Sequence, residues 1–125
     1  MRMKEQIRAG KAYSFVEEVK NTKDSIEGKY KSLAKRLPQM ITQNGLLSTL
    51  SFLKSKGKGE HELLLKHICE YLAEELSLEK KDCKYLIKEL LNMNLERYMF
   101  ISQEAIYFAI WLKRIAEGEL EDDTP

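Results

Sequence analysis

An all-α fold, a single compact bundle of about five to six helices, is what this sequence predicts. The 125 residues include 18 Leu, 16 Lys and 16 Glu but only two Val and four Thr, and straight-chain residues prefer helices whereas β-branched residues prefer strands. Apolar residues, 43% of the total, suffice for a core and recur at three- and four-residue spacing. A chain of this length predicts one domain, which we place at residues 1–117 with a possible subdivision near 57–59. Residues 118–125 are expected to form an acidic, frayed tail.

Three helices are expected in the N-terminal half. The first runs from about Met3 to Val19 and is followed by a polar break at residues 21–25. The second carries an apolar stripe at helical spacing, made of Ile26, Tyr30, Leu33 and Leu37. We expect it to break at Pro38, because proline lacks the N–H that a helix interior uses. Gly45 predicts a helix end, and a short helix over about 46–54 should follow.

Three further helices are expected in the C-terminal half. Amphipathic patterns run over about 64–76 and 86–91. Ser102 is followed two residues later by Glu104, and a hydroxyl cap with a carboxylate in the first turn predicts that the last helix begins at Ser102. That helix is apolar around most of its circumference, so it should be buried among other helices or against another subunit.

Catalysis, a metal site and export find no support in the sequence. Cys69 and Cys83 lack a CxxC spacing, so we predict two small core residues without a disulfide or a zinc ion. His61 and His67 are six residues apart, which puts them on different faces of a helix. The N-terminus lacks the apolar stretch of a secretory signal, and the longest apolar run, of eight residues, is too short to cross a membrane. We therefore predict a cytoplasmic protein that is not an enzyme and uses no cofactor, metal or small-molecule substrate.

Charge is divided unevenly along the chain. Residues 1–58 carry 13 Lys and Arg against 5 Asp and Glu, a net charge of +8, whereas residues 59–125 carry 8 against 15, a net charge of −7. A basic half is typical of proteins that bind nucleic acid, but it can equally neutralise an acidic half of the same molecule. The five acids of the basic half are scattered, which disfavours a metal-dependent nuclease. Charge alone leaves nucleic-acid binding and internal neutralisation open.

Basic side chains of the first half recur at helical spacing and are the candidate nucleic-acid contacts. Those of the first helix fall on one side of it, those of the second lie outside its apolar stripe, and a third group follows the short helix. Because aromatic residues do not alternate with these cations, we expect contacts to backbone phosphates that are independent of base sequence. The ten candidates are Lys4, Arg8, Lys11, Lys29, Lys31, Lys35, Arg36, Lys54, Lys56 and Lys58.

Two blocks of the sequence resemble a known family. The first lies within residues 29–57 and its matching positions are Ser32-Leu33-Ala34, Leu37-Pro38, Met40-Ile41, Asn44-Gly45-Leu46, the run 49–53 and Lys56. The second is made of Tyr98, Ser102-Gln103-Glu104-Ala105, Trp111-Leu112-Lys113-Arg114 and Ala116-Glu117. On these positions the chain resembles the small α-helical subunit of the type III-B CRISPR RNA-targeting effector, the Cmr complex. Residues 59–95 are weakly diagnostic, and Ser102 stands where Thr is more usual, although either hydroxyl can cap a helix.

The resemblance implies an all-helical, non-catalytic protein of antiviral defence. It would stack beside the repeated backbone subunits of the complex and line the channel that holds guide and target RNA, with target cleavage belonging to another subunit. Its implied partners are the other Cmr subunits and the RNA backbone. The alternative is a protein-only helical adaptor whose positive surface meets an acidic protein surface.

Overall fold

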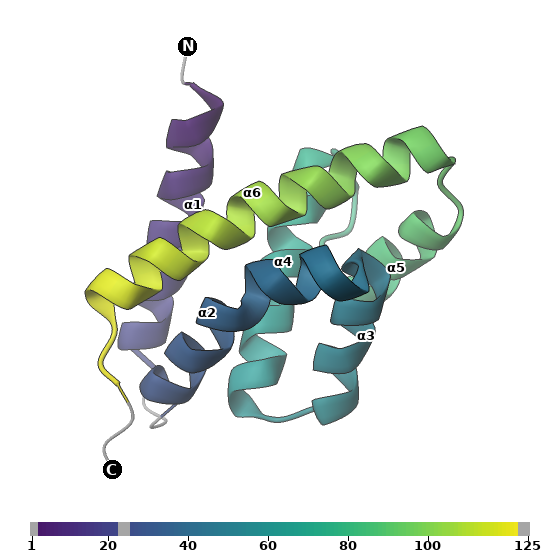
Figure 1. Ribbon diagram of the computed structural model, residues 1–125. Helices are drawn as coiled ribbons and strands as arrows, with labels where there is room; N and C mark the ends of the chain where they lie inside the picture. The colour runs from purple at the N-terminus through teal and green to yellow at the C-terminus, as the bar shows by residue number, and fades with distance from the viewer. Residues whose placement is uncertain (1–2, 23–25, 123–125) are drawn as a thin grey trace.

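The structure is a computed structural model that describes residues 3–22 and 26–122. Six helices and no strand occur in those residues, so the predicted fold class is confirmed (Figure 1). The helices are α1 (Lys4–Lys20), α2 (Glu27–Asn44), α3 (Leu46–Lys56), α4 (Gly59–Glu75), α5 (Cys83–Leu91) and α6 (Leu95–Glu119).

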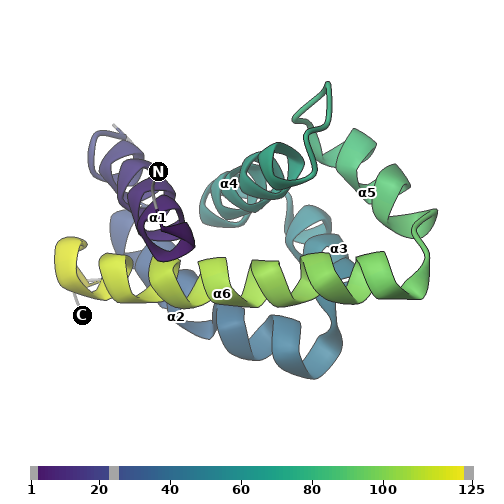
Figure 2. The ribbon, with the colours of Figure 1, turned by 90° about the horizontal axis from the view of Figure 1, so that it is seen from above.

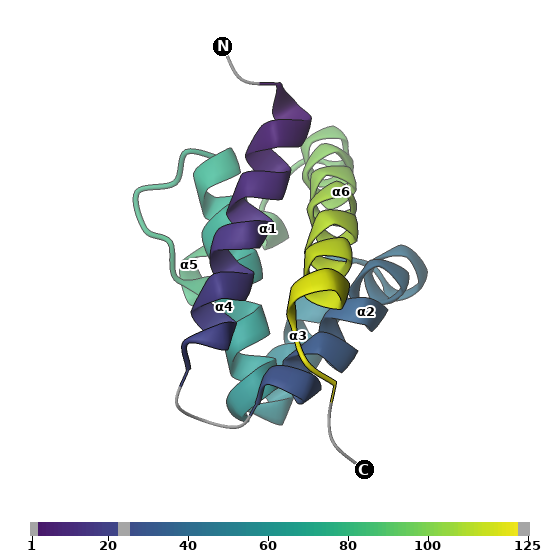
Figure 3. The ribbon, with the colours of Figure 1, turned by 90° about the vertical axis from the view of Figure 1, so that its left-hand side faces the viewer.

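The longest helix, α6, organises the bundle. It crosses the whole molecule and packs against both α1 and α2 (Figures 1 and 2). On the other side of the core, α4 packs against α2, α3 and α5. As Figure 3 shows, α5 and α2 lie on opposite sides of the molecule. The surface of α2 that faces away from α6 and α4 is therefore well separated from α5.

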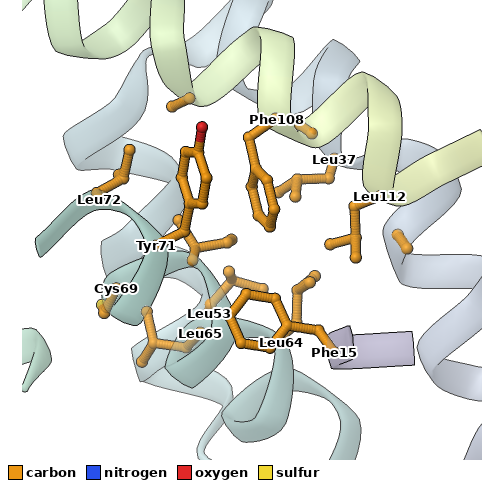
Figure 4. Close-up of a cluster of buried hydrophobic side chains, with 14 of the residues drawn as sticks. Phe15, Leu37, Leu53, Leu64, Leu65, Cys69, Tyr71, Leu72, Phe108 and Leu112 are labelled. Atoms are coloured by element: carbon orange, nitrogen blue, oxygen red, sulfur yellow. The ribbon is translucent and has the colours of Figure 1, made fainter. Parts of the chain in front are cut away.

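The core is one continuous hydrophobic cluster with side chains from both the basic and the acidic half of the chain. At its centre the Tyr71 ring stacks on the Phe108 ring with centroids 4.0 Å apart, and Phe15 meets Phe108 edge-on at 6.0 Å (Figure 4). Such aromatic contacts add to the stabilisation from burial. Residues before and after the loop at 57–59 thus pack into the same core.

The second helix continues through Pro38, so the expected break is wrong. Pro38 lies inside α2, where the missing N–H costs about 3 kcal/mol. Leu33, Leu37 and Ile41 are all buried on one side of the helix, and each such burial contributes roughly 1.5–3 kcal/mol. Burial on both sides of the proline therefore outweighs its local cost. The end predicted at Gly45 is confirmed, and its φ of +92° is one that side chains with a Cβ rarely adopt.

The last helix begins at Leu95, so the start expected at Ser102 is wrong. The Asn94 side chain caps α6 by accepting a hydrogen bond from the Arg97 N–H at 2.9 Å. Ser102 lies in the helix interior, and its Oγ is buried without a hydrogen-bond partner among the described residues. The same capping chemistry operates one residue before Leu95 instead.

The described part of the C-terminal tail is anchored, in contrast to the expected fraying from residue 118. Helix α6 continues to Glu119, and Leu120 is buried. The Leu120 carbonyl accepts a hydrogen bond from Lys31 Nζ at 3.0 Å, and the Glu121 N–H donates to Glu27 at 2.6 Å. Residues 123–125 lie outside the described residues.

Cys69 and Cys83 form a disulfide, so the prediction of two unlinked cysteines is wrong. The turn after α4 folds α5 back onto it and brings the two Cα atoms within 5.2 Å, a distance that a disulfide can bridge. A separation of 14 residues does not reveal this approach.

None of the helices in the described ranges is long and apolar enough to cross a membrane.

Candidate nucleic-acid interface

The ten predicted cations fall into three groups with different surroundings. Lys4, Arg8 and Lys11 lie on α1, four lie on α2, and the remaining three lie at the end of α3 and in the loop that follows. The helix α6 packs against both α1 and α2. The three groups therefore differ in how much of their charge faces outward.

The α1 group is neutralised within the molecule. Lys4 forms an ion pair with Glu75, and Lys11 Nζ lies 2.9 Å from a carboxylate oxygen of Glu74. Both acids lie at the end of α4. For this helix, internal neutralisation, one of the two alternatives that charge left open, is the one observed.

Arg8 is the most firmly held of the α1 cations. Its guanidinium donates two hydrogen bonds, of 2.7 and 2.8 Å, to Glu104 on α6, and it lies 4.6 Å from the centroid of the Tyr107 ring. The hydroxyl of Tyr71 also donates to Glu104, at 2.7 Å. Burial would raise the pKa of Glu104, but the hydrogen bonds from Arg8 and Tyr71 outweigh it and lower that pKa. A bidentate, part-buried pair of this kind ties α1 to α6.

The α2 group keeps most of its charge exposed. Lys29, Lys35 and Arg36 are exposed and make no ion pair with another described residue. Glu27, the only acid of α2, accepts the hydrogen bond from the tail. We define the α2 face as the exposed side of this helix, formed by Lys29, Ser32, Lys35, Arg36, Gln39 and Gln43. Its members are cations, amides and a hydroxyl, all groups that donate hydrogen bonds to phosphate.

Lys31 points away from the α2 face. Its side chain is only 12% exposed and forms an ion pair of 2.9 Å with Asp122 in addition to its bond to the Leu120 carbonyl. The hydrogen bond from Lys31 lowers the pKa of Asp122. Lys31 therefore anchors the tail.

The third group lies at the C-terminal end of α3. Lys54, Lys56 and Lys58 are exposed, and none forms an ion pair within the described ranges. Cations here also complement the partial negative charge of a helix end. Lys56 Nζ lies 5.4 Å from the centroid of the Phe52 ring, so one aromatic residue does accompany these cations. The i, i+4 spacing of the pair is the sequence signal that reveals it.

Two surface features were missed by sequence reasoning. A groove of about 250 Å³ runs between α2 and α3, lined by Arg36, Met40, Asn44, Ser48, Thr49 and Phe52. Large apolar side chains are also exposed around the junction of α5 and α6, where Leu91, Leu95, Met99 and Phe100 form an apolar patch. Neither follows from periodicity alone, because each combines residues of two helices.

One of the two histidines, His67, lies inside the core. His67 is fully buried, and its ring stacks on Phe15 with centroids 4.3 Å apart. Its Nδ1 lies 2.7 Å from the Tyr30 hydroxyl and its Nε2 lies 3.2 Å from Glu18. Burial lowers the pKa of His67 to about 4. No group of three or more His, Cys, Asp and Glu side chains suited to a metal ion occurs in residues 3–22 and 26–122.

Comparison with known proteins identifies close relatives of this chain. The family model described as CRISPR-associated protein (Cas_Cmr5) matches residues 4–119. The CRISPR system Cmr subunit Cmr5 of Thermus thermophilus is 30% identical over 122 residues, which cover 98% of this chain and 100% of that protein. The Cmr subunit Cmr5 of Thermotoga maritima is 34% identical over 116 residues, covering 90% and 84% of the two chains.

A solved structure agrees with these relationships. The crystal structure of a CRISPR-associated Cmr5 family protein from Thermus thermophilus superposes with a TM-score of 0.80 at 32% sequence identity. The match covers 97% of this chain and 100% of that one. The likeness therefore includes the whole bundle.

Proposed function

The chain belongs to the CRISPR-associated Cmr5 family, and from this premise we propose that it is a non-catalytic small subunit of a type III-B CRISPR (Cmr) ribonucleoprotein in antiviral defence. The names of its relatives as Cmr subunits support assembly with other subunits of such a complex. Its task there is to hold guide and target RNA through contacts to backbone phosphates. The location that this role implies is the cytoplasm.

The observation that carries the RNA contact is the charge of the α2 face. Phosphate binding requires cations that are not already neutralised, because affinity comes from the release of counterions. Of the ten predicted contacts, Lys4, Arg8, Lys11 and Lys31 are engaged within the molecule. We propose that the phosphate contacts are made by the other six, which are Lys29, Lys35, Arg36, Lys54, Lys56 and Lys58.

A double charge reversal on the α2 face tests this proposal. Lys35→Glu with Arg36→Glu removes two cations from the face, and we expect the assembled complex to retain less RNA. The dependence of log affinity on log salt should become shallower by about 0.7 for each single-strand phosphate contact that is lost. RNA retention measured at several salt concentrations gives both quantities.

The matched control reverses two charges elsewhere. Lys84→Glu with Lys88→Glu changes the net charge equally but lies on α5, across the molecule from α2 (Figures 2 and 3). Both lysines are exposed, so the control should fold normally and keep the original salt dependence. Equal losses in the two double variants would mean that only net charge matters and would refute the assignment to α2.

A protein-only adaptor is the second candidate, and the apolar patch at the α5–α6 junction favours it. Leu95 and Phe100 are 71% and 68% exposed, and contiguous exposed apolar side chains are typical of protein contacts. In this function the α2 face would meet an acidic protein surface. Purification of the native protein with and without ribonuclease separates the candidates, because only the first function yields RNA that copurifies with the protein and is protected from the nuclease by the complex.

A further inference from the structure

The groove between α2 and α3 combines hydrogen-bond donors with an aromatic ring. The two helices meet at Gly45, where the chain turns (Figure 1). This turn places Arg36 and Asn44 of α2 beside Ser48 and Phe52 of α3 around a space of about 250 Å³. No acidic residue lines it. A ligand in this groove would therefore meet hydrogen-bond donors and an aromatic ring. If the ligand carried a phosphate, no carboxylate of the groove would repel it.

The polar groups of the groove are available for a ligand. Arg36, Asn44 and Ser48 are exposed, and none of their side chains forms a hydrogen bond or ion pair with another described residue. Thr49 differs, because it is buried and its hydroxyl donates to the Gly45 carbonyl at 2.8 Å. Thr49 thus forms part of the wall. The side-chain groups left open are a guanidinium, an amide and a hydroxyl, which can donate and, for the last two, also accept hydrogen bonds.

The apolar side of the groove is aromatic. Phe52 is half-buried, and its ring is held by the core and by an edge-to-face contact with His61, whose ring centroid lies 5.9 Å away. Lys56 Nζ lies 5.4 Å from the centroid of the same ring. Lys56 therefore lies over one face of the ring, and Arg36 lines the α2 side of the groove.

We propose that this groove takes one unpaired nucleobase of single-stranded RNA. The base would stack on Phe52 and use its polar edge to bond Asn44 and Ser48, while Arg36 and Lys56 contact the phosphates that flank it. Stacking on an aromatic side chain tolerates any base, so the contact is compatible with binding that ignores sequence. The volume is below the roughly 300–1,000 Å³ typical of pockets for drug-sized ligands, which fits a single base. The inference rests on the proposed RNA-binding function and adds a base contact to its phosphate contacts.

Phe52→Leu tests the inference, because leucine preserves an apolar side chain in the core but cannot stack on a base. The probes are a fluorescein-labelled 12-mer of uridine and a 12-mer of abasic ribose phosphate, which has the same backbone charge. Fluorescence anisotropy with the full chain at low salt measures binding. We expect the variant to lose about tenfold in affinity for the uridine 12-mer, as expected for one lost stack, and nothing for the abasic 12-mer.

Two further variants make the result interpretable. Phe100→Ala removes an exposed aromatic ring outside the groove, and binding of both probes should be unchanged. Asn44 lies on the exposed rim of the groove, and Asn44→Ala should weaken binding of the uridine probe alone, by a few-fold. Asn44→Ala decides the question if circular dichroism shows that Phe52→Leu fails to fold.

The outcomes separate this inference from the function on which it rests. If both probes bind and neither groove variant distinguishes them, the base contact is refuted while phosphate binding stands. If Phe100→Ala reproduces the loss, the base lies at another site and the inference is equally wrong. If the unmodified protein binds neither probe at low salt, the proposed function fails for the free chain, and the base contact fails with it.

Discussion

Two polar clusters inside this protein join residues that are far apart in the chain. Arg8, Tyr71 and Glu104 form one, and His67 with its partners Tyr30 and Glu18 forms the other. In both, a buried titratable side chain has its hydrogen bonds supplied by neighbouring helices. Such satisfied polar groups favour one arrangement of helices over others because misplacing a partner leaves a buried group unpaired.

The His67 cluster predicts that the protein loses stability as the pH falls from about 6.5 toward 5. Unfolded, the imidazole takes up a proton near pH 6.5, whereas burial in the folded state lowers its pKa to about 4. In this window the unfolded chain binds more protons, so acid favours unfolding, and above pH 6.5 the effect vanishes. We expect a decrease of about 2 kcal/mol in the free energy of unfolding between pH 7 and pH 5, measured by urea denaturation.

Removal of the titrating group provides the control for this effect. His67→Gln retains a hydrogen-bonding side chain without an ionisable ring, so its stability should vary less over the same pH window. NMR of the unmodified protein supplies an independent readout, in which the His67 ring should remain neutral at pH 5. A protonated His67 at that pH in the folded state contradicts the prediction.

For individual residues, the sequence predicts which side chains are buried better than it predicts which side chains contact one another. Helical spacing places Tyr30, Leu33 and Leu37 on the buried stripe of α2, as observed. It cannot show that Arg8 faces Glu104, because the two are 96 residues apart, or that Cys69 meets Cys83 across a turn. Contacts between helices depend on how the helices pack, and one sequence shows only the periodicity within each.

Among the elements, α6 gives the clearest case of competing local signals. Both Asn94 and Ser102 are good capping residues followed by a carboxylate, Glu96 and Glu104, two residues later. Burial decides between them. Ile101 and Ala105 lie in the core on either side of Ser102, so interrupting the helix there would expose part of its apolar side. The helix therefore extends to the earlier cap, and Glu104 becomes the buried partner of Arg8.

Two single substitutions test where α6 begins. Asn94→Ala removes the side chain that accepts from the Arg97 N–H, and we expect it to destabilise the protein by about 1 kcal/mol. Ser102→Ala removes a buried hydroxyl that has no partner among the described residues, so it should be neutral or slightly stabilising. Thermal or urea unfolding of both variants gives the comparison. A larger loss for Ser102→Ala than for Asn94→Ala would restore the later start.

The Pro38 region illustrates the same balance with the opposite local signal. Proline favours an interruption, yet α2 continues because its buried stripe extends on both sides. Gly45, by contrast, does end the helix, since a positive φ there directs the chain into α3. Sequence signals were therefore reliable where burial agreed with them and misleading where it opposed them.

In the whole molecule, the positive charges of the two basic helices, α1 and α2, differ in whether acidic residues neutralise them. Acids at the end of α4 and on α6 take up the cations of α1, whereas Lys29, Lys35 and Arg36 of α2 have no described ion-pair partner. The sequence showed a surplus of positive charge in the first half but not which helix would keep it. That outcome depends on the packing of α1 against α6 and α4, which periodicity does not determine.

At the tail, an acidic residue of the second half lies close to the α2 face. Asp122 is 80% exposed and forms an ion pair with Lys31, and the positive charge of Lys35 also contributes to lowering its pKa. Its negative charge therefore acts on cations at this end of α2. If RNA phosphates bind the α2 face, Asp122 opposes them.

Asp122→Asn should consequently tighten RNA binding. Removal of one exposed carboxylate beside the α2 face is expected to raise affinity for single-stranded RNA about twofold at low salt, the scale of a surface ion pair, with the gain disappearing as salt screens the charge. Glu79→Gln, an equal change of charge in the exposed turn before α5, is the control and should have no effect. Because both variants alter the same net charge, a gain confined to Asp122→Asn locates the bound RNA beside α2, and equal gains would place it elsewhere.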